Sequence, residues 1–193
     1  ASAPGADGPA NVVDAVSVAS SAAAQGMGTL VVFGGEIHHA RCARKTDTTS
    51  LTAFSSPQTG LLGRVTEGHS TIWARLPRNP AVDPARLDGS VPIVPSAAGD
   101  DGTFARAILE TDPDGAVIGT LGAGYLAPDV LELWAEAAQR IPVVAYCRPE
   151  RGVILNGTYG YAGSEKDLRV SDIMPAGFLS PQMFPVAASG GQI

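Results

Sequence analysis

The sequence has few basic residues, and very few of them are lysines. It contains 13 lysines and arginines against 19 acidic residues, a formal net charge of −6, and only Lys45 and Lys166 are lysines. A protein that binds DNA or RNA usually shows a basic stripe, so this balance argues against a nucleic-acid partner. No apolar run approaches the ~18 to 20 residues of a membrane span, so we expect a globular protein that does not cross a membrane.

Side chains that ligate metals are also scarce. Cys42 and Cys147 lie far apart in sequence and neither belongs to a Cys-x-x-Cys pair, so a zinc site is not expected. The sequence does not decide whether the two cysteines form a disulfide. His38 and His39 are adjacent on a predicted strand, so they point to opposite faces and cannot ligate one metal together. We therefore expect no metal and no cofactor. No signal peptide is visible, which favours the cytoplasm, with the periplasm or secretion as alternatives.

The first part of the chain predicts a helix followed by short strands. Asp7 and Pro9 are suited to a helix start, and residues 11–25 repeat apolar side chains at helical spacing. This predicted apolar stripe consists of Val12, Val13, Val16, Ala19 and Ala23. Residues 29–33 and 36–40 predict two strands, the first one buried.

A polar loop, a hairpin and a linker follow. Residues 41–50 are rich in threonine and predict a loop, and residues 62–66 and 70–74 predict a hairpin. Residues 75–90 contain three prolines and no periodicity, so we interpret them as a linker between two domains. The predicted domains are therefore residues 1–74 and 91–193.

The second part alternates strands with helices. Strands are predicted at residues 91–94, 115–118 and 141–147, a helix runs from Asp100 or Asp101 to about Glu110, and a second begins at Pro128. The expected inward faces include Phe104, Ala107 and Ile108 in the first helix, and Val130, Leu131 and Trp134 in the second. This α/β pattern predicts a small parallel sheet with helices on both faces, and such sheets bind ligands at the carboxyl ends of their strands.

A glycine-rich segment, residues 119–124, follows one predicted strand. Read as Gly122-x-Gly124-x-x-Ala127, it fits a dinucleotide-binding fingerprint, in which backbone amides approach a pyrophosphate. That fingerprint usually lies after the first strand of its unit and needs an acidic residue after the next strand, where this chain has Cys147 and Arg148. We therefore favour a tight turn that faces another ligand.

Two charged residues stand out as candidates for chemistry. Lys45 lies among threonines in the predicted loop, and a desolvated lysine can act as a base where an arginine cannot; a solvated loop is the alternative. Glu165 lies in a loop rich in glycine and tyrosine, where its carboxylate could grip a substrate amino group. The alternative is structural, since Ser164 and Asp167 have the spacing of a helix capping motif.

Several segments together resemble the bacterial-type L-asparaginase family. In family order they are ADGPAN (residues 6–11), VVF (31–33), GEIHHA (35–40), ARKTDTTSLTAFSSPQTGLLGRV (43–65), GTLGAG (119–124) and GTYGYAGSEKDL (157–168). The resemblance spans nearly the whole chain. It implies the C-terminal part of the two-domain asparaginase fold, with a parallel sheet and a small α/β C-terminal domain.

The resemblance also implies an activity and site residues. These enzymes hydrolyse the side-chain amide of asparagine, and sometimes glutamine, with one threonine as nucleophile and a second threonine polarised by an aspartate and a lysine. Lys45 matches that lysine, and Glu165 matches a glutamate that contacts the substrate's amino end in a neighbouring subunit's site. Gly124 and Tyr125 fall on the substrate loop. Family members are typically dimers or tetramers.

This chain departs from the family pattern in three places. It contains no Thr-Gly-Gly-Thr or His-Gly-Thr-Asp-Thr segment, which carry the family's catalytic threonines. Tyr125 stands where the family often has asparagine or another polar residue, so the substrate can differ. A final helix with Ser180 as cap and Pro181 at its first position is interrupted by Pro185, and we expect it to be short.

These departures lead to one expectation about assembly and three about function. We expect a second polypeptide, either a separate gene product or a cleaved N-terminal piece, to supply the threonine segments, because helix faces and sheet edges would otherwise be exposed. The chain would then be a subunit of an amidohydrolase acting on asparagine or a related small amide. The alternatives are a homologue redirected to other amide or amino-acid chemistry in specialised metabolism, and a non-catalytic homologue.

Overall fold

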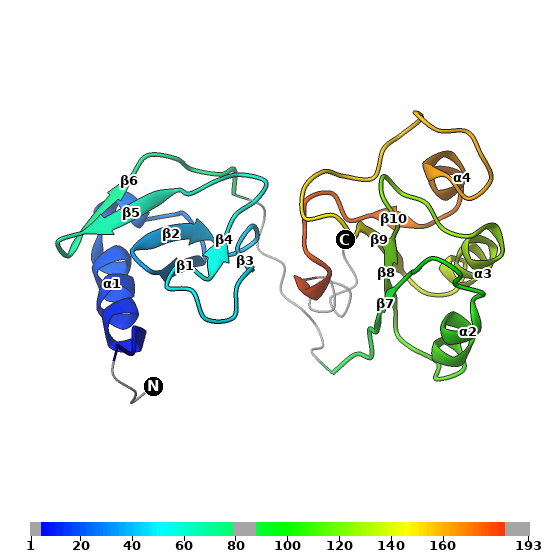
Figure 1. Ribbon diagram of the computed structural model, residues 1–193, viewed down its shortest axis with the longest axis horizontal. Coiled ribbons are helices and arrows are strands. Elements are labelled where there is room, and N and C mark those ends of the chain that lie inside the picture. Colours follow the sequence, from blue (N-terminus) through cyan, green and yellow to red (C-terminus); the bar gives the residue numbers. More distant parts are fainter. Residues whose placement is uncertain (1–4, 79–87, 184–193) are drawn as a thin grey trace. The chain divides into compact units, whose positions relative to one another are not determined.

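The computed structural model describes residues 5–78 and 88–183, and the chain divides into two compact units, Ala1–Pro80 and Ala81–Ile193 (Figure 1). The boundary between them falls within residues 75–90, of which residues 79–87 lie outside the described part. Each unit has its own sheet and its own buried core.

The first unit combines one α-helix with short strands. Its elements are α1 (Gly8–Ser20), the 3-10 helix η1 (Ala22–Ala24), β1 (Leu30–Phe33), β2 (Glu36–His39), β3 (Arg44–Lys45), β4 (Phe54–Ser55), β5 (Gly63–Thr66) and β6 (His69–Ile72).

Helix α1 starts near the predicted position but turns a different face inward. Its N-terminus carries Pro9 in the first turn, as expected, although the Asp7 side chain makes no capping hydrogen bond. The helix ends at Ser20 and is followed by η1, five residues earlier than predicted. In the predicted stripe, the side chains of Val12, Val13 and Val16 are 64%, 64% and 62% exposed. Val18, which was not part of that stripe, is buried. The exposed part of the stripe therefore does not face the core of the described unit.

The sheet of the first unit has the order β1-β2-β5-β6, with every neighbouring pair antiparallel. The strand at residues 29–33, which was expected to be buried, is thus a half-buried antiparallel strand, β1. A tight turn joins β1 to β2 because Gly34 and Gly35 both adopt positive φ. Asn11 fixes this turn to α1, since its Oδ1 accepts a hydrogen bond of 2.9 Å from the Gly34 amide.

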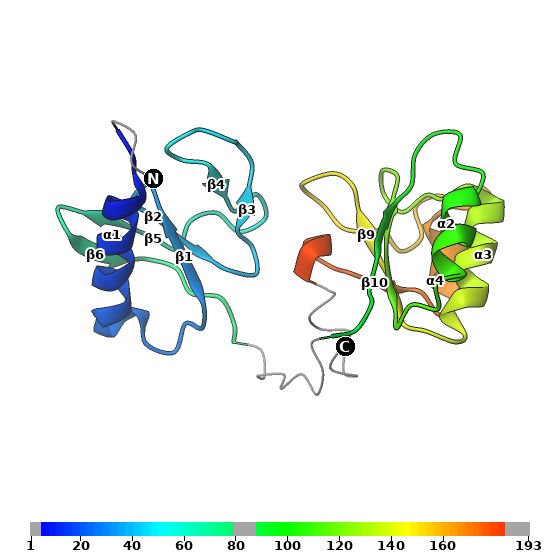
Figure 2. The ribbon, with the colours of Figure 1, turned by 90° about the horizontal axis from the view of Figure 1, so that it is seen from below.

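The predicted hairpin is confirmed as β5 and β6, which are joined by Glu67 and Gly68, both at positive φ. On one face of this sheet α1 packs against β1, β5 and β6, and Val18, Met27, Ile37 and Leu62 form the buried core (Figure 2).

The second unit is an α/β layer structure. Its elements are β7 (Ile93–Pro95), α2 (Thr103–Leu109), β8 (Ala116–Thr120), α3 (Pro128–Ala138), β9 (Val143–Cys147), α4 (Glu165–Val170), β10 (Met174–Pro175) and the 3-10 helix η2 (Pro181–Met183). The strands form a parallel sheet in the order β10-β9-β8-β7, so the predicted parallel α/β sheet is confirmed.

The two faces of this parallel sheet are covered unequally. Helices α2, α3 and α4 contribute Ala105, Trp134 and Leu168 to the main core on one face (Figure 2). On the other face, β8 and β9 turn Val117 and Val144 toward a smaller cluster, and η2 contacts β8. Helices on both faces were expected, and among the described residues the second face receives the 3-10 helix alone.

Details of the helices differ from expectation. In α2 it is Ala105, not Phe104, that is buried, because Phe104 is 58% exposed. In α3 the predicted Val130, Leu131 and Trp134 are buried as expected. The predicted last helix is the short η2, while Pro185 and the residues around it lie outside the described part.

Across the described residues, every helix falls short of the length and apolar character needed to cross a membrane. The same residues hold no group of three or more histidine, cysteine, aspartate or glutamate side chains that could bind a metal ion. Cys42 and Cys147 are both free thiols.

Candidate active site

Lys45 lies on a short strand, which corrects the prediction of a loop at this position. Strand β3 pairs with β4 in an antiparallel arrangement that places Lys45 opposite Phe54. The Lys45 ammonium lies 5.3 Å from the centre of the Phe54 ring and 5.8 Å from the centre of the Phe33 ring. The two rings contact each other at a centroid distance of 5.1 Å. Lys45 is exposed, so these cation–π contacts, rather than burial, orient its charge.

The segment between β3 and β4 is closed by an aspartate. Asp47 Oδ1 accepts hydrogen bonds from the amides of Thr49 and Ser50, at 2.8 and 2.7 Å. These two backbone donors, together with the nearby Lys45 charge, lower the pKa of the Asp47 carboxyl. The amide of Thr46 donates to the Ala53 carbonyl at 2.8 Å and closes the base of the loop. The threonines around Lys45 thus belong to a tight, internally bonded turn.

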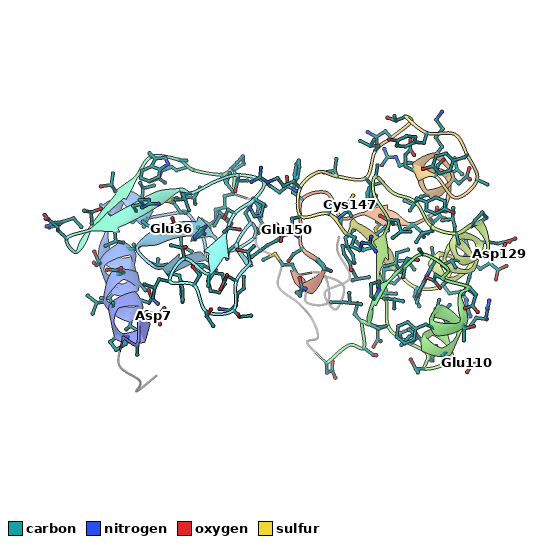
Figure 3. All side chains as sticks on the ribbon, viewed as in Figure 1. Asp7, Glu36, Glu110, Asp129, Cys147 and Glu150 are labelled. Carbon is teal, nitrogen blue, oxygen red and sulfur yellow. The ribbon has the colours of Figure 1, made fainter. Side chains whose placement is uncertain are left out.

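A buried histidine, His38, pairs with Ser56, and sequence reasoning did not identify this pair. His38, on β2, is completely buried, and its Nδ1 lies 3.0 Å from Ser56 Oγ. Among the described residues its Nε2 has no hydrogen-bond partner, and it lies 3.6 Å from a carboxylate oxygen of Glu36. The other oxygen of Glu36 accepts from Arg64 at 2.7 Å. Figure 3 labels Glu36 in the first unit. Burial lowers the pKa of His38, and the Glu36 charge partly opposes that effect.

In the second unit, the glycine-rich segment turns sharply after β8. Leu121 and Tyr125 form an isolated bridge, and the intervening Gly122 and Gly124 have φ of 49° and 119°. A Cβ on Gly124 would lie 3.1 Å from the Cβ of Glu165 and 2.8 Å from an Ile154 methyl carbon. Glycine is therefore required here for close packing against the Glu165 segment. This arrangement favours the tight-turn interpretation over the dinucleotide fingerprint.

Glu165 is the first residue of α4 and is 1% exposed. Its Oε1 accepts a hydrogen bond of 2.7 Å from the Tyr159 amide. The capping interpretation of this segment holds only in part. Ser164 makes no side-chain cap, and its buried Oγ has no hydrogen-bond partner among the described residues. Asp167 accepts a hydrogen bond of 2.8 Å from the Gly163 amide.

The turn after β8 and the Glu165 segment together enclose a pocket. The pocket has a volume of about 270 Å³ and is lined by Leu121, Gly122, Ala123, Gly124, Tyr125, Tyr159, Tyr161 and Glu165. Backbone hydrogen bonds from Leu126 to Gly163 and from Leu155 to Ala123, each 3.0 Å, tie its two sides together. The three predicted substrate-binding residues, Gly124, Tyr125 and Glu165, therefore lie in one pocket. Lys45 belongs to the first unit.

Three tyrosines crowd this pocket. The Tyr125 and Tyr161 rings meet edge to face at a centroid distance of 5.6 Å, and the Tyr159 and Tyr161 rings are tilted at 5.7 Å. Tyr159 and Tyr161 were not predicted as site residues. The sequence signal that could have identified them is the Tyr-Gly-Tyr segment, whose tyrosines lie six and four residues before Glu165.

Comparison with known proteins gives the family. The model described as "Asparaginase, N-terminal" matches residues 1–78, and that described as "Glutaminase/Asparaginase C-terminal domain" matches residues 90–186. A probable L-asparaginase from Deinococcus radiodurans is 38% identical over 177 residues, which cover 90% of this chain and 54% of that relative. The chain belongs to the bacterial-type asparaginase family.

The fold of this asparaginase-family chain agrees with that assignment. The crystal structure of a probable cytoplasmic L-asparaginase from Campylobacter jejuni superposes with a TM-score of 0.83 at 26% identity, over 96% of this chain and 59% of that chain. L-asparaginase 2 of Bacillus subtilis is 31% identical over 175 residues, 86% of this chain and 45% of that relative. The chain spans about half the length of the curated relatives it matches.

Proposed function

We propose that this chain carries part of the active site of an amidohydrolase that hydrolyses the side-chain amide of asparagine or a related small amide. The observation that carries this proposal is the pocket in which Gly124, Tyr125 and Glu165 meet, in a chain that belongs to the asparaginase family. Glu165 receives the substrate's ammonium group, and the Gly124 turn provides close backbone approach to the substrate.

The reaction needs a nucleophile and a charge that activates it. A threonine hydroxyl attacks the amide carbon, a C–O bond forms, the C–N bond breaks and the nitrogen leaves as ammonia. Water then hydrolyses the acyl-threonine to the carboxylate. In this proposal Lys45, which Phe33 and Phe54 orient, polarises a second threonine that helps to activate the nucleophile or the water.

We propose that the catalytic threonines come from a segment other than these 193 residues. A second polypeptide is our first candidate, and another part of a longer chain is the alternative. The apolar side chains of Val12, Val13 and Val16 on α1 support an additional segment, because it would cover them. We also propose that the complete enzyme is a homo- or hetero-oligomer in the cytoplasm, with the periplasm and secretion as alternatives.

The direct test measures ammonia release from asparagine and glutamine by this chain alone and with a polypeptide that carries the threonine segments. We expect turnover only in the mixture. The Lys45→Ala substitution should lower the turnover rate by roughly 10²-fold or more, which is the effect of removing a positioned acid–base group. Lys166→Ala is the matched control and should retain activity. Unchanged turnover in the Lys45→Ala protein would exclude this mechanism.

A redirected homologue is the second candidate function, and Tyr125 favours it because an aromatic ring stands in the proposed substrate pocket. Activity on another amide but not on asparagine would support it. Tight ligand binding without any turnover would instead support a non-catalytic homologue.

A further inference from the structure

The β3–β4 hairpin that carries Lys45 lies on the face of the β1-β2-β5-β6 sheet opposite α1 (Figure 2). Ile37 on β2 belongs to the core under α1, so the next residue, His38, points to the other face. There the Nδ1 of His38 lies 3.0 Å from the Oγ of Ser56, which follows β4 directly. Both side chains are buried. This contact, called the His38–Ser56 anchor here, joins the base of the hairpin to a central strand of the sheet.

The surroundings of His38 select one neutral form of its ring. Its Nε2 lies 3.6 Å from a carboxylate oxygen of Glu36, and that carboxylate is held in place by Arg64, which donates to its other oxygen at 2.7 Å. A carboxylate attracts an N–H group and repels a lone pair, so the proton of the neutral ring belongs on Nε2. Nδ1 then keeps its lone pair and accepts a hydrogen bond from the Ser56 hydroxyl.

A proton added to His38 would remove that acceptor. The imidazolium ring carries an N–H on both nitrogens, so the Ser56 hydroxyl could no longer donate to it, and the added charge would be completely buried. Burial lowers the pKa of His38, and the Glu36 charge partly opposes that effect. Because the pKa is lower in the closed hairpin than in an open, hydrated one, acid favours the open hairpin. The anchor is complete above about pH 6.5, the ordinary histidine value, and is lost as the pH falls from there toward the pKa of the closed form.

Few other charges surround this ring. The titratable and charged side chains on β2, β3, β5 and the β3–β4 turn are Glu36, His39, Arg44, Lys45, Asp47 and Arg64. His39 points to the opposite face of the sheet, and β1 places the apolar Val31 beside His38. Glu36 is the charged neighbour that acts on the pKa of His38.

We propose that His38, with its proton on Nε2, is the positioning residue that seats the Lys45 hairpin on the sheet, and that protonation of His38 releases the hairpin. The seating of the hairpin stands on these contacts alone, whereas its effect on turnover rests on the proposed function. In that function Lys45 activates the reacting groups and Glu165 binds substrate. A displaced Lys45 therefore lowers kcat more than it raises KM.

The first experiment follows the ring nitrogens of His38 and the side chain of Lys45 by NMR in the full chain. The titration runs from about pH 8 to about pH 5, which spans the ordinary histidine pKa and stays above that of aspartate. At neutral pH we expect a proton on Nε2 and none on Nδ1. The Lys45 methylene protons should be shifted upfield by the Phe33 and Phe54 rings, and this shift should shrink in acid. A proton on Nδ1 at neutral pH, or a Lys45 signal that stays constant through the titration, overturns the proposal.

Substitutions separate the proton from the ring. His38→Asn keeps an acceptor oxygen near the position of Nδ1 but cannot titrate, so it should retain the Lys45 shift and remove its acid change. His38→Leu leaves Ser56 without an acceptor and should lose the shift at every pH. His39→Asn is the matched control, because this neighbouring side chain accepts the Arg41 amide and not the hairpin. An acid change that persists in folded His38→Asn, or disappears in His39→Asn, contradicts the proposal. The wild-type titration tests it even where a variant fails to fold.

The turnover experiment distinguishes this inference from the proposed function. With the threonine-bearing polypeptide present, His38→Leu should lower kcat about tenfold to a hundredfold with a smaller change in KM, which is the effect of a misplaced catalytic group. His38→Asn should restore kcat at neutral pH and move the acid limb of the kcat profile to lower pH. Turnover that depends on Lys45 but has the same pH profile in wild type and His38→Asn would reject the anchor and retain the amidohydrolase. The expected NMR transition without turnover of any amide would retain the anchor and reject the amidohydrolase.

Discussion

The chain holds two candidate functional regions, called half-sites here: the β3–β4 hairpin with Lys45 in the first unit and the pocket with Glu165 in the second. They are built in opposite ways. In the first unit, Lys45 is an exposed residue on a two-residue strand, oriented by aromatic rings and by a turn that Asp47 closes. In the second unit, Glu165 is almost completely buried and is held by a backbone amide and by glycines that permit close packing. The first half-site is therefore shaped by local contacts at the surface, and the second by the packing of a parallel α/β core.

The largest expected effect tests the packing of the second half-site. Gly163 has φ of 81°, and a Cβ there would lie 2.0 Å from the Leu126 carbonyl oxygen. We expect Gly163→Ala to lower the free energy of unfolding by about 2–5 kcal/mol, since left-handed strain adds to overpacking. Urea denaturation measures this, and the tyrosine signals of the pocket should shift.

Gly122→Ala is the matched control for that prediction. Gly122 also has positive φ, but a Cβ there meets nothing within 4 Å. We expect the Gly122→Ala substitution to lower the free energy of unfolding by about 1–2 kcal/mol, from backbone strain alone. Equal costs at Gly122 and Gly163 would mean that backbone conformation, and not close packing against Leu126, determines the shape of the pocket.

A second prediction compares one substitution in the two units. Ser56→Ala removes the hydrogen-bond partner of the buried His38 imidazole, so we expect a loss of about 1–3 kcal/mol in stability. Ser164→Ala removes a buried hydroxyl that has no hydrogen-bond partner in the described part of the chain, so stability should stay the same or increase. Denaturant unfolding of both variants tests the pair. A costly Ser164→Ala would indicate that its hydroxyl is satisfied, for example by water.

Sequence reasoning performed differently on the two units, for a physical reason. In the second unit, strands and helices alternate along the chain, and periodicity therefore predicted β8, α3 and β9 closely. In the first unit, Val12, Val13 and Val16 of α1 follow helical spacing but are exposed in the described structure. Periodicity shows that a helix has an apolar face, but it does not say which segment covers that face.

The candidate sites show the same limit. Lys45 was placed in a loop because two-residue strands such as β3 and β4 leave almost no pattern in a sequence. Gly124, Tyr125 and Glu165 were proposed from a family resemblance, and they line one pocket. The positions of Tyr159 and Tyr161 in the pocket depend on a loop conformation that is fixed by backbone contacts. Those contacts leave no recognisable pattern in the sequence.

The smallest expected effect concerns the turn that follows Lys45. Its backbone hydrogen bonds from Thr49 and Ser50 lower the pKa of Asp47, so the ionised form is favoured in the folded state. A lowered carboxyl pKa contributes stability above the ordinary aspartate value, and this stability is lost as the pH falls through the folded pKa. We therefore expect the turn to loosen below about pH 4, the ordinary range for aspartate.

Amide hydrogen exchange and chemical shifts of Thr49 and Ser50, followed against pH, measure that loosening. Asp47→Asn keeps an acceptor oxygen but has no titrating charge, so it should retain the turn at neutral pH and remove the acid transition. Asp47→Ala should loosen the turn at every pH. The Leu126 amide, which donates to the backbone carbonyl of Gly163 in the other unit, serves as the internal reference. An acid transition that persists in Asp47→Asn would show that another group controls the turn, and the first half-site would then be less local than its contacts indicate.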